Sequence, residues 1–216
     1  MLQRYAARLT ICELNNTFYR HPTRERIESW IGDVPADFRF TVKAHRTASM
    51  RAFDTDPEGV LPWLLAPFEH FGERLGAVLW RVPATRPRDD ARLEAFLAAW
   101  PPSIPIALEF QHASWHEPAV RDRLAAAGAA FCVTDLDDPS EPELEATARF
   151  VYLRLRRDAY TDEALERWAD RLARDLAAGR AAYVFFRHDP DGLAPDRALD
   201  LTKRIERLRG EALDPG

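Results

Sequence analysis

The sequence predicts an α/β fold, a TIM-type (β/α)8-like barrel with seven recognisable strands. Short apolar runs alternate along the chain with charged segments of helical periodicity, which is the order of βα units in a parallel sheet. The apolar runs also carry polar residues at every second position, whereas strands covered by helices on both faces are almost continuously apolar. A closed barrel, with helices outside and polar side chains toward its lumen, accounts for both patterns.

The order of the elements follows from these patterns. The predicted strands are residues 10–15, 38–44, 77–82, 104–110, 130–135, 150–155 and 181–186. The predicted helices are residues 23–31, 57–74, 89–100, 118–127, 162–178 and 195–208. Thr23 and Asp162 are candidate N-caps. Gly76, Gly128 and Gly179 each stand before a strand, where the end of a helix favours a residue with positive φ.

The chain has neither a linker-like stretch nor an internal repeat, so residues 1–216 are expected to form a single domain. Its 216 residues are few for a barrel of this type, for which about 250 is usual. The chain also begins on a helix-like segment rather than on a strand. We therefore expect an N-terminally truncated barrel whose first strand is missing from this chain.

Composition narrows the classes of function. The apolar fraction of 46% is typical of a globular protein, and no apolar run is long enough to span a membrane. Cys12 and Cys132 lie far apart in apolar runs, which favours a reducing, cytoplasmic location. The net charge of −5 gives no general attraction to nucleic acid, although Arg46 and Arg51, in the predicted loop after Lys43, could extend a local basic surface. The sequence does not predict an oligomeric state.

Polar residues gather where the predicted strands end, and this is where barrels of this type place their active sites. Cations outnumber acids at these positions, and a buried surplus of cations requires compensation. We therefore expect a small anionic or sugar-like ligand, the alternative being an internal network of ion pairs. The candidate catalytic residues are Glu13, Lys43, Glu109 and Asp135, and the candidate substrate-binding residues are Asn15, Tyr19, Arg81, Gln111, Trp115, Arg154 and Arg187.

Lys43 has a second distinction. Of the 30 basic residues, 28 are Arg, and Lys43 is the one Lys on a predicted strand. A compact amine that can lose its proton suits a Schiff base, whereas a partner for Glu13 or Glu109 is the simpler role.

No motif in the chain indicates a metal or a cofactor. The spacing of His112 and His116 resembles a helical zinc pair, but a loop is predicted there, and we expect His112 to cap or bridge with Ser114 and Trp115. The two aspartates before Pro139 are typical of a turn. A glycine-rich phosphate loop and a nucleophile elbow are both missing, and both cysteines have the spacing of the helix-facing core.

Several motifs occur together in a characteristic order. They are Glu13-x-Asn15-x-Thr17-Phe18-Tyr19-Arg20, Phe38-Arg39-Phe40-x-Val42-Lys43-Ala44, Glu109-Phe110-x-His112-x-Ser114-Trp115, Phe150-Val151-Tyr152-Leu153-Arg154-Leu155 and Tyr183-Val184-Phe185-Phe186. This set resembles the YecE-like family, also called the domain of unknown function 72 family. The resemblance implies a TIM-type barrel of uncharacterised activity. Three features depart from the family: the absent Gly-Thr-Ser-Gly-Trp-like first strand, Arg81 in place of Gln, and Arg187-His188-Asp189 in place of Asn-Asn-Asp.

Three functions remain. The leading hypothesis is an enzyme, a hydrolase or a lyase, in which Glu13 or Glu109 acts as acid or base on a small anionic or carbohydrate-like substrate. Lys43, Arg154 and Arg187 would hold the anion. The second is a metal-dependent phosphodiesterase of the endonuclease-barrel kind that uses Glu109, Asp135, His188 and Asp189. The third is a non-catalytic binding or interaction module, which the missing strand and the altered Arg81 and Arg187 would suit.

Overall fold

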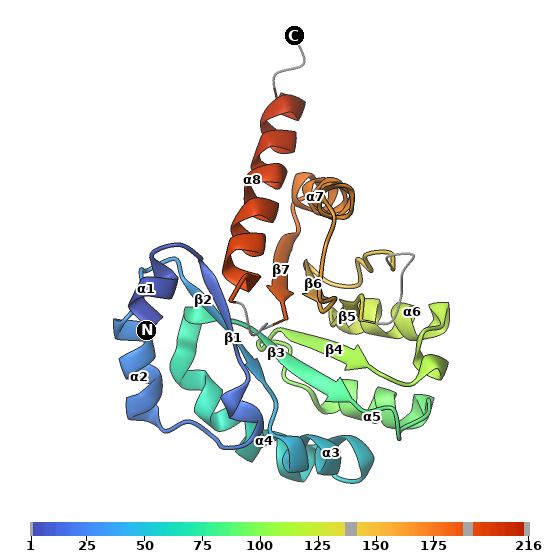
Figure 1. Cartoon of the computed structure of the whole chain (residues 1–216). Coiled ribbons are helices and arrows are strands. Elements are labelled where there is room, and N and C mark those ends of the chain that lie inside the picture. Colours follow the sequence, from blue (N-terminus) through green and yellow to red (C-terminus); the bar gives the residue numbers. More distant parts are fainter. Residues whose placement is uncertain (1, 137–141, 188–191, 214–216) are drawn as a thin grey trace. The chain divides into compact units, whose positions relative to one another are not determined.

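The computed structural model describes residues 2–136, 142–187 and 192–213 (Figure 1). Its fold is the α/β fold of the TIM-barrel type that the sequence predicts, with seven strands in the described residues, each parallel to the strands with which it is shown to pair. The chain divides into two compact units, Met1–Ala129 and Ala130–Gly216, which we describe in turn as unit 1 and unit 2. That the two make one domain stays a prediction.

Unit 1 carries four strands in parallel order, each followed by helices. Its elements, where η marks a 3₁₀ helix, are α1 (Leu2–Ala6), β1 (Ile11–Leu14), η1 (Asn16–Phe18), α2 (Arg24–Gly32), β2 (Arg39–Lys43), α3 (Arg46–Asp54), α4 (Pro57–Leu65), η2 (Ala66–Arg74), β3 (Leu75–Val82), α5 (Asp90–Ala99), β4 (Ile106–Phe110), η3 (Ala113–Trp115) and α6 (Pro118–Ala127). The strands begin and end within two residues of their predicted bounds.

The helices of unit 1 depart from prediction in two places. The predicted helix 57–74 is wrong as one element, because α4 ends at Leu65 and η2 follows, with Gly72 at a φ of +52°. Helix α3 was not predicted, so Arg46 and Arg51 lie on a helix and not in a loop. Two of the residues that α3 buries, Ala48 and Ser49, are too small or too polar to make an apolar stripe in the sequence.

The helix-facing side of the unit 1 sheet forms an aromatic core. Trp80 of β3 is fully buried, with ring centroids 4.5 Å from Phe96 of α5 and 5.7 Å from Trp100. Phe110 of β4 stacks on Trp115 at 4.7 Å. Side chains of this size bury enough apolar surface to fix the helices on the sheet. The polar side chains of the same strands are thereby placed on the opposite face.

The pairing of β2 with β3 contains one irregularity. Phe40 pairs with Leu75 but Thr41 pairs with Ala77, so the register shifts by one residue and no residue of β2 pairs with Gly76. The expectation that Gly76 ends a helix is wrong, since Gly76 lies inside β3 and positive φ occurs at Gly72 instead. Gly128, at a φ of +65°, ends α6 as predicted.

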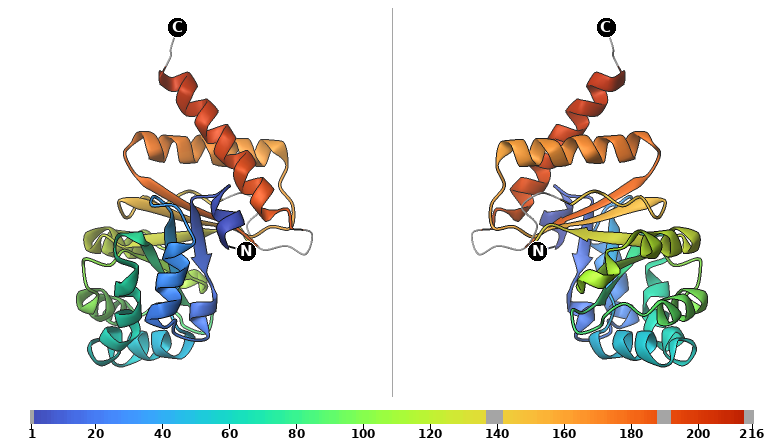
Figure 2. Two further views of the ribbon diagram at one scale, coloured as in Figure 1. Left: turned by 90° about the vertical axis from the view of Figure 1, so that its left-hand side faces the viewer. Right: turned by 90° about the vertical axis from the view of Figure 1, so that its right-hand side faces the viewer.

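Unit 2 has three parallel strands and two long helices. Its elements are β5 (Ala130–Thr134), β6 (Phe150–Leu155), α7 (Asp162–Ala177), β7 (Ala181–Phe186) and α8 (Ala194–Leu213). Helices α7 and α8 pack against each other and against β7 (Figure 2). The N-cap of α7 is Thr161, whose hydroxyl accepts a hydrogen bond from the Ala164 amide, and not Asp162 as expected. Among the described residues, no helix combines the length and apolarity needed to cross a membrane.

The register of unit 2 corrects one further expectation. Cys132 of β5 pairs with Tyr152 of β6, which pairs with Tyr183 of β7, and Thr134 pairs with Arg154. Because side chains alternate along a strand, Cys132 shares the face of Tyr152 and Arg154. The expectation that Cys132 and Arg154 lie on opposite faces of their strands is therefore wrong.

Candidate functional site

Four ionisable side chains share one face of the unit 1 sheet, near the carboxyl ends of its strands. Glu13 of β1 is level with Thr41, two residues before Lys43 on β2. Lys43 is in turn level with Leu79, two residues before Arg81 on β3. Arg81 lies directly opposite Glu109 of β4. The face therefore presents an acid, two bases and an acid across neighbouring strands, which we call the charged face.

Two members of the charged face are buried. Lys43 is 9% exposed and Glu109 is 1% exposed. A buried charge is unfavourable unless opposite charges or hydrogen bonds compensate it, and the two acids and two bases of this face balance in number. Arg39 does not add to it, because its guanidinium donates to the carbonyl oxygens of Asp37 and Phe38 at the start of β2. Within unit 1 the expected surplus of cations is thus missing from the ends of the strands.

The Lys43 ammonium rests on an aromatic side chain that the sequence analysis did not select. Its Nζ atom lies 4.3 Å from the centroid of the Phe18 ring, and Phe18 meets Tyr19 edge to face at 5.3 Å. The Thr17 hydroxyl lies 2.7 Å from the carbonyl oxygens of both Leu14 and Lys43. The 3₁₀ turn η1 is thus attached to the ends of β1 and β2, and its Phe18 ring contacts both of the predicted residues Tyr19 and Lys43.

Two further pairs of predicted site residues are joined by hydrogen bonds. The Asn15 amide donates to a Glu13 carboxylate oxygen at 3.0 Å, and Arg81 donates to the Gln111 amide oxygen at 2.8 Å. The Nε of Arg81 is buried and has no hydrogen-bond partner among the residues that the structure describes. An unpaired buried donor is unfavourable, so the Nε of Arg81 is a point of the charged face where a hydrogen-bond partner is lacking among the described residues.

Asp135, in unit 2, is fully buried and tied to the segment that follows β6. Its Oδ1 accepts from the Arg156 amide at 2.6 Å, its Oδ2 accepts from the Tyr160 hydroxyl at 2.7 Å, and Arg157 lies 3.4 Å from Oδ2. Burial, together with the hydrogen bond to Asp135, raises the pKa of Tyr160 well above its usual range. Thr134, the last residue of β5, is level with Arg154, and Asp135 lies just beyond the strand, so the alternation that predicted a shared face for Asp135 and Arg154 does not extend to Asp135.

The other predicted residues lie in different surroundings. Trp115 is 0% exposed and its indole N–H donates to the Arg86 carbonyl at 2.8 Å, so it packs in the core. Arg154 is half-buried on β6. Arg187 follows β7, is 52% exposed and lies 3.3 Å from Asp158. His112 caps η3 as predicted, because its Nδ1 accepts from the Ser114 amide at 3.2 Å.

The structure adds nothing in favour of a metal site. Across residues 2–136, 142–187 and 192–213, no three His, Cys, Asp or Glu side chains converge as metal ligands would. His188 and Asp189, which the phosphodiesterase hypothesis requires, lie outside the described residues, as does the predicted turn before Pro139.

Charged side chains at the carboxyl ends of parallel strands define an α/β protein of the barrel class with a candidate site in the usual place. The chain belongs to the family described as "Protein of unknown function DUF72", whose model matches residues 1–215. The resemblance found in the motifs is thereby confirmed.

Relatives support the family and the fold. The UPF0759 protein YunF of Bacillus subtilis (strain 168) is 33% identical over 130 residues, which cover 54% of this chain and 44% of that protein. The match therefore spans less than half of the curated relative. A crystal structure of the DUF72 protein EF0366 from Enterococcus faecalis V583 has a TM-score of 0.80 at 21% identity and covers 95% of this chain and 93% of its own. TM1631 from Thermotoga maritima MSB8 has a TM-score of 0.69 at 24% identity, with coverages of 92% and 85%.

Proposed function

We propose that this protein is an enzyme that binds a small anionic or carbohydrate-like molecule on the charged face and converts it by acid–base chemistry. The observation that carries the proposal is the burial of Lys43 and Glu109, two ionisable side chains on one face at the carboxyl ends of parallel strands. Burying them costs stability, and enzymes accept this cost where chemistry requires it.

The proposed roles follow from position. Lys43 and Arg81, on neighbouring strands between the two acids, hold a carboxylate, a phosphate or a row of hydroxyl groups. Glu13 and Glu109 flank the two cations and exchange protons with the substrate, one as base and one as acid. Asn15 and Gln111 orient Glu13 and Arg81 through the hydrogen bonds described above. Hydrolysis and elimination both use such a pair of carboxyl groups.

Binding is tested by thermal unfolding of the protein with a panel of sugar acids, sugar phosphates and their neutral parent sugars. Glu109→Gln and Lys43→Met remove the two buried charges. Matched controls are Glu94→Gln, on exposed α5 surface, and Lys203→Met, which changes the one other lysine. We expect anionic ligands to raise the unfolding temperature of the wild type and of both controls, but not of the two variants.

Turnover is then followed by NMR with each stabilising ligand. We expect product with the wild type and the controls, and loss of product in Glu13→Gln and Glu109→Gln. Binding without turnover in any protein would instead support the non-catalytic module. Hydrolysis of an added phosphodiester, bis(4-nitrophenyl) phosphate, that requires a divalent metal and stops on chelation would support the phosphodiesterase. Equal stabilisation of wild type and Lys43→Met would refute the site.

A further inference from the structure

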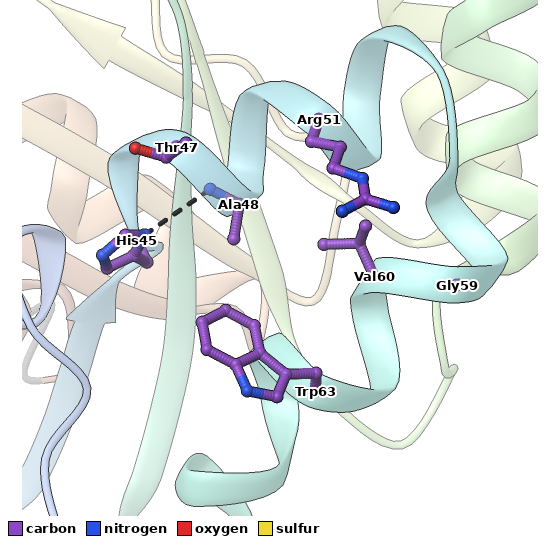
Figure 3. Close-up of a pocket in the computed structure, with 7 residues that line it drawn as sticks. All are labelled: His45, Thr47, Ala48, Arg51, Gly59, Val60 and Trp63. Atoms are coloured by element: carbon purple, nitrogen blue, oxygen red, sulfur yellow. Dashed lines mark hydrogen bonds between the residues drawn. The ribbon is translucent and has the colours of Figure 1, made fainter.

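A separate cavity of about 300 Å³ lies between α3 and α4 of unit 1 (Figure 3). Ala48 and Arg51 of α3 line one side, Val60 and Trp63 of α4 line the other, and His45 stands at one end. The cavity does not include any residue of the charged face, so it is distinct from the site proposed above. Its volume is at the lower end of the range for small-molecule sites.

The wall of the cavity is apolar and flat. Trp63 is 58% exposed, whereas Ala48 and Val60, which flank it, are 8% and 6% exposed. Figure 3 shows the indole on the α4 side of the cavity, below Ala48. A large exposed indole gains stability when another apolar surface covers it, and it prefers a planar partner.

The indole also contacts the ring of His21. The His21 ring lies 4.3 Å from the Trp63 ring with 31° between their planes, and His45 meets His21 edge to face at 5.5 Å. Burial and the neighbouring His45 lower the pKa of His21, which therefore stays neutral at pH 7. The indole is thus held in place before any ligand arrives, which reduces the entropy lost on binding.

Two polar side chains that line the cavity, His45 and Arg51, offer hydrogen-bond donors, and the Thr47 hydroxyl can donate or accept. His45 accepts a 3.5 Å hydrogen bond from the Ala48 amide through Nδ1, which leaves Nε2 as the N–H donor of the ring. Arg51 lies 3.3 Å from Asp56, but both side chains are exposed, and such pairs are weak. Asp56 is also engaged elsewhere, since its Oδ1 accepts from the Gly59 amide at 2.9 Å and caps α4. Arg51 therefore has donors left for an anion.

We propose that this cavity binds a small planar aromatic carboxylate. The ring of the ligand lies on Trp63, against Ala48 and Val60, and its carboxylate accepts hydrogen bonds from Arg51. The proposal uses both properties of the cavity, a flat apolar wall and the cation of Arg51: a neutral sugar would leave the cation without a counter-charge, and an aliphatic acid would stack less well on the indole.

The probes are benzoate and 2-naphthoate, with the corresponding amides as neutral analogues and cyclohexanecarboxylate as a non-planar acid. Calorimetric titration measures their affinities. We expect the aromatic acids to bind the wild type at least about tenfold more tightly than the amides or the non-planar acid, the difference that a charge-assisted hydrogen bond or a lost stacking partner makes. Equal affinity for acid and amide would overturn the proposal.

Amino-acid substitutions test whether the aromatic acid binds in this cavity. Trp63→Leu and Arg51→Met should each weaken naphthoate binding about tenfold or more, while Arg24→Met, an exposed arginine of α2 paired with Glu28, should not change it. Asp56→Asn keeps a capping side chain and removes the competing carboxylate, so it should tighten binding. Glu109→Gln and Lys43→Met should bind naphthoate as the wild type does, which separates this site from the charged face. Unfolding curves confirm that each variant is folded, and unchanged affinity in Trp63→Leu would refute the assignment.

Discussion

The ammonium nitrogen of Lys43 lies 4.3 Å from the centroid of the Phe18 ring, close enough for a cation–π interaction in a nearly buried position. Because Phe18 belongs to η1 and Lys43 ends β2, this contact links the turn after β1 to the neighbouring strand. It also gives the charged face one side chain that orients Lys43 without carrying a charge of its own.

We expect Phe18 and Lys43 to be coupled energetically. In a double-mutant cycle of Phe18→Leu and Lys43→Met, measured by urea unfolding, the coupling should be about 0.5–2 kcal/mol. The matched pair is Tyr19→Leu with Arg46→Met, whose ring-to-cation distance is 5.9 Å and whose tyrosine is 68% exposed. Its coupling should be smaller. A coupling near zero for Phe18 and Lys43 would contradict the contact.

Asp135→Asn should destabilise the protein by about 2–3 kcal/mol, since a buried carboxylate that accepts from a backbone amide and a hydroxyl contributes through charged hydrogen bonds. Tyr160→Phe, which removes one of these bonds, should cost about 1 kcal/mol. Asp158→Asn is the exposed control and should change the free energy of unfolding by less than about 0.5 kcal/mol. If Asp135→Asn unfolds as the wild type does, Asp135 is not a structural anchor and its catalytic role regains support.

Burial of the Cys12 thiol and, to a smaller extent, the neighbouring Glu13 carboxylate raise the pKa of Cys12 from 9.0 to about 11. The folded state therefore favours the neutral thiol. The neutral Cys12 thiol contributes its full share of the folding stability below pH 9, and this share is lost as the pH rises from 9 to 11. Unfolding free energies should fall over this range, and fall less in Cys12→Ala. In a Cys132→Ala background, alkylation of native Cys12 should reach half its maximal rate near pH 11, and a midpoint near pH 9 would contradict the raised pKa.

Gly128→Ala should cost roughly 1 kcal/mol, because Gly128 ends α6 at a φ of +65°, where a Cβ atom strains the backbone. Gly32→Ala is the matched control at the end of α2. Gly32 has no positive φ and an added Cβ there meets no atom within 4 Å, so alanine should be neutral or mildly stabilising. Chemical unfolding measures both, and equal effects would show that the backbone conformation at Gly128 is not the cause.

The strands could be predicted from the sequence because their apolar runs are short, aromatic or branched, and bounded by charge. Helix α3 could not, since Ala48 and Ser49 contribute burial without an apolar pattern. Strand alternation also predicted that Lys43 and Glu109 lie on one face, which the register confirms.

Prediction of the site failed where strand alternation no longer applies. Asp135 lies just beyond the end of β5 and Trp115 lies in η3, beyond the end of β4, so the direction of their side chains is not set by the period of two of a strand. The contact between Phe18 and Lys43 depends on how η1 folds over β2, and no local pattern reports it. The hydrogen bond between Arg81 and Gln111 likewise required the register of two strands.

The unpaired Gly76 at the start of β3 decides which way Arg81 points. If Gly76 were paired and the register did not shift, Thr41 would pair with Gly76 and every later side chain of β3 would exchange faces relative to β2. Arg81 would then enter the helix-covered core, and Trp80 would take its place beside Lys43. The composition of the site thus depends on one unpaired residue, because the register shift at Gly76 brings Arg81 to the face of Lys43 and leaves Trp80 on the helix-covered face.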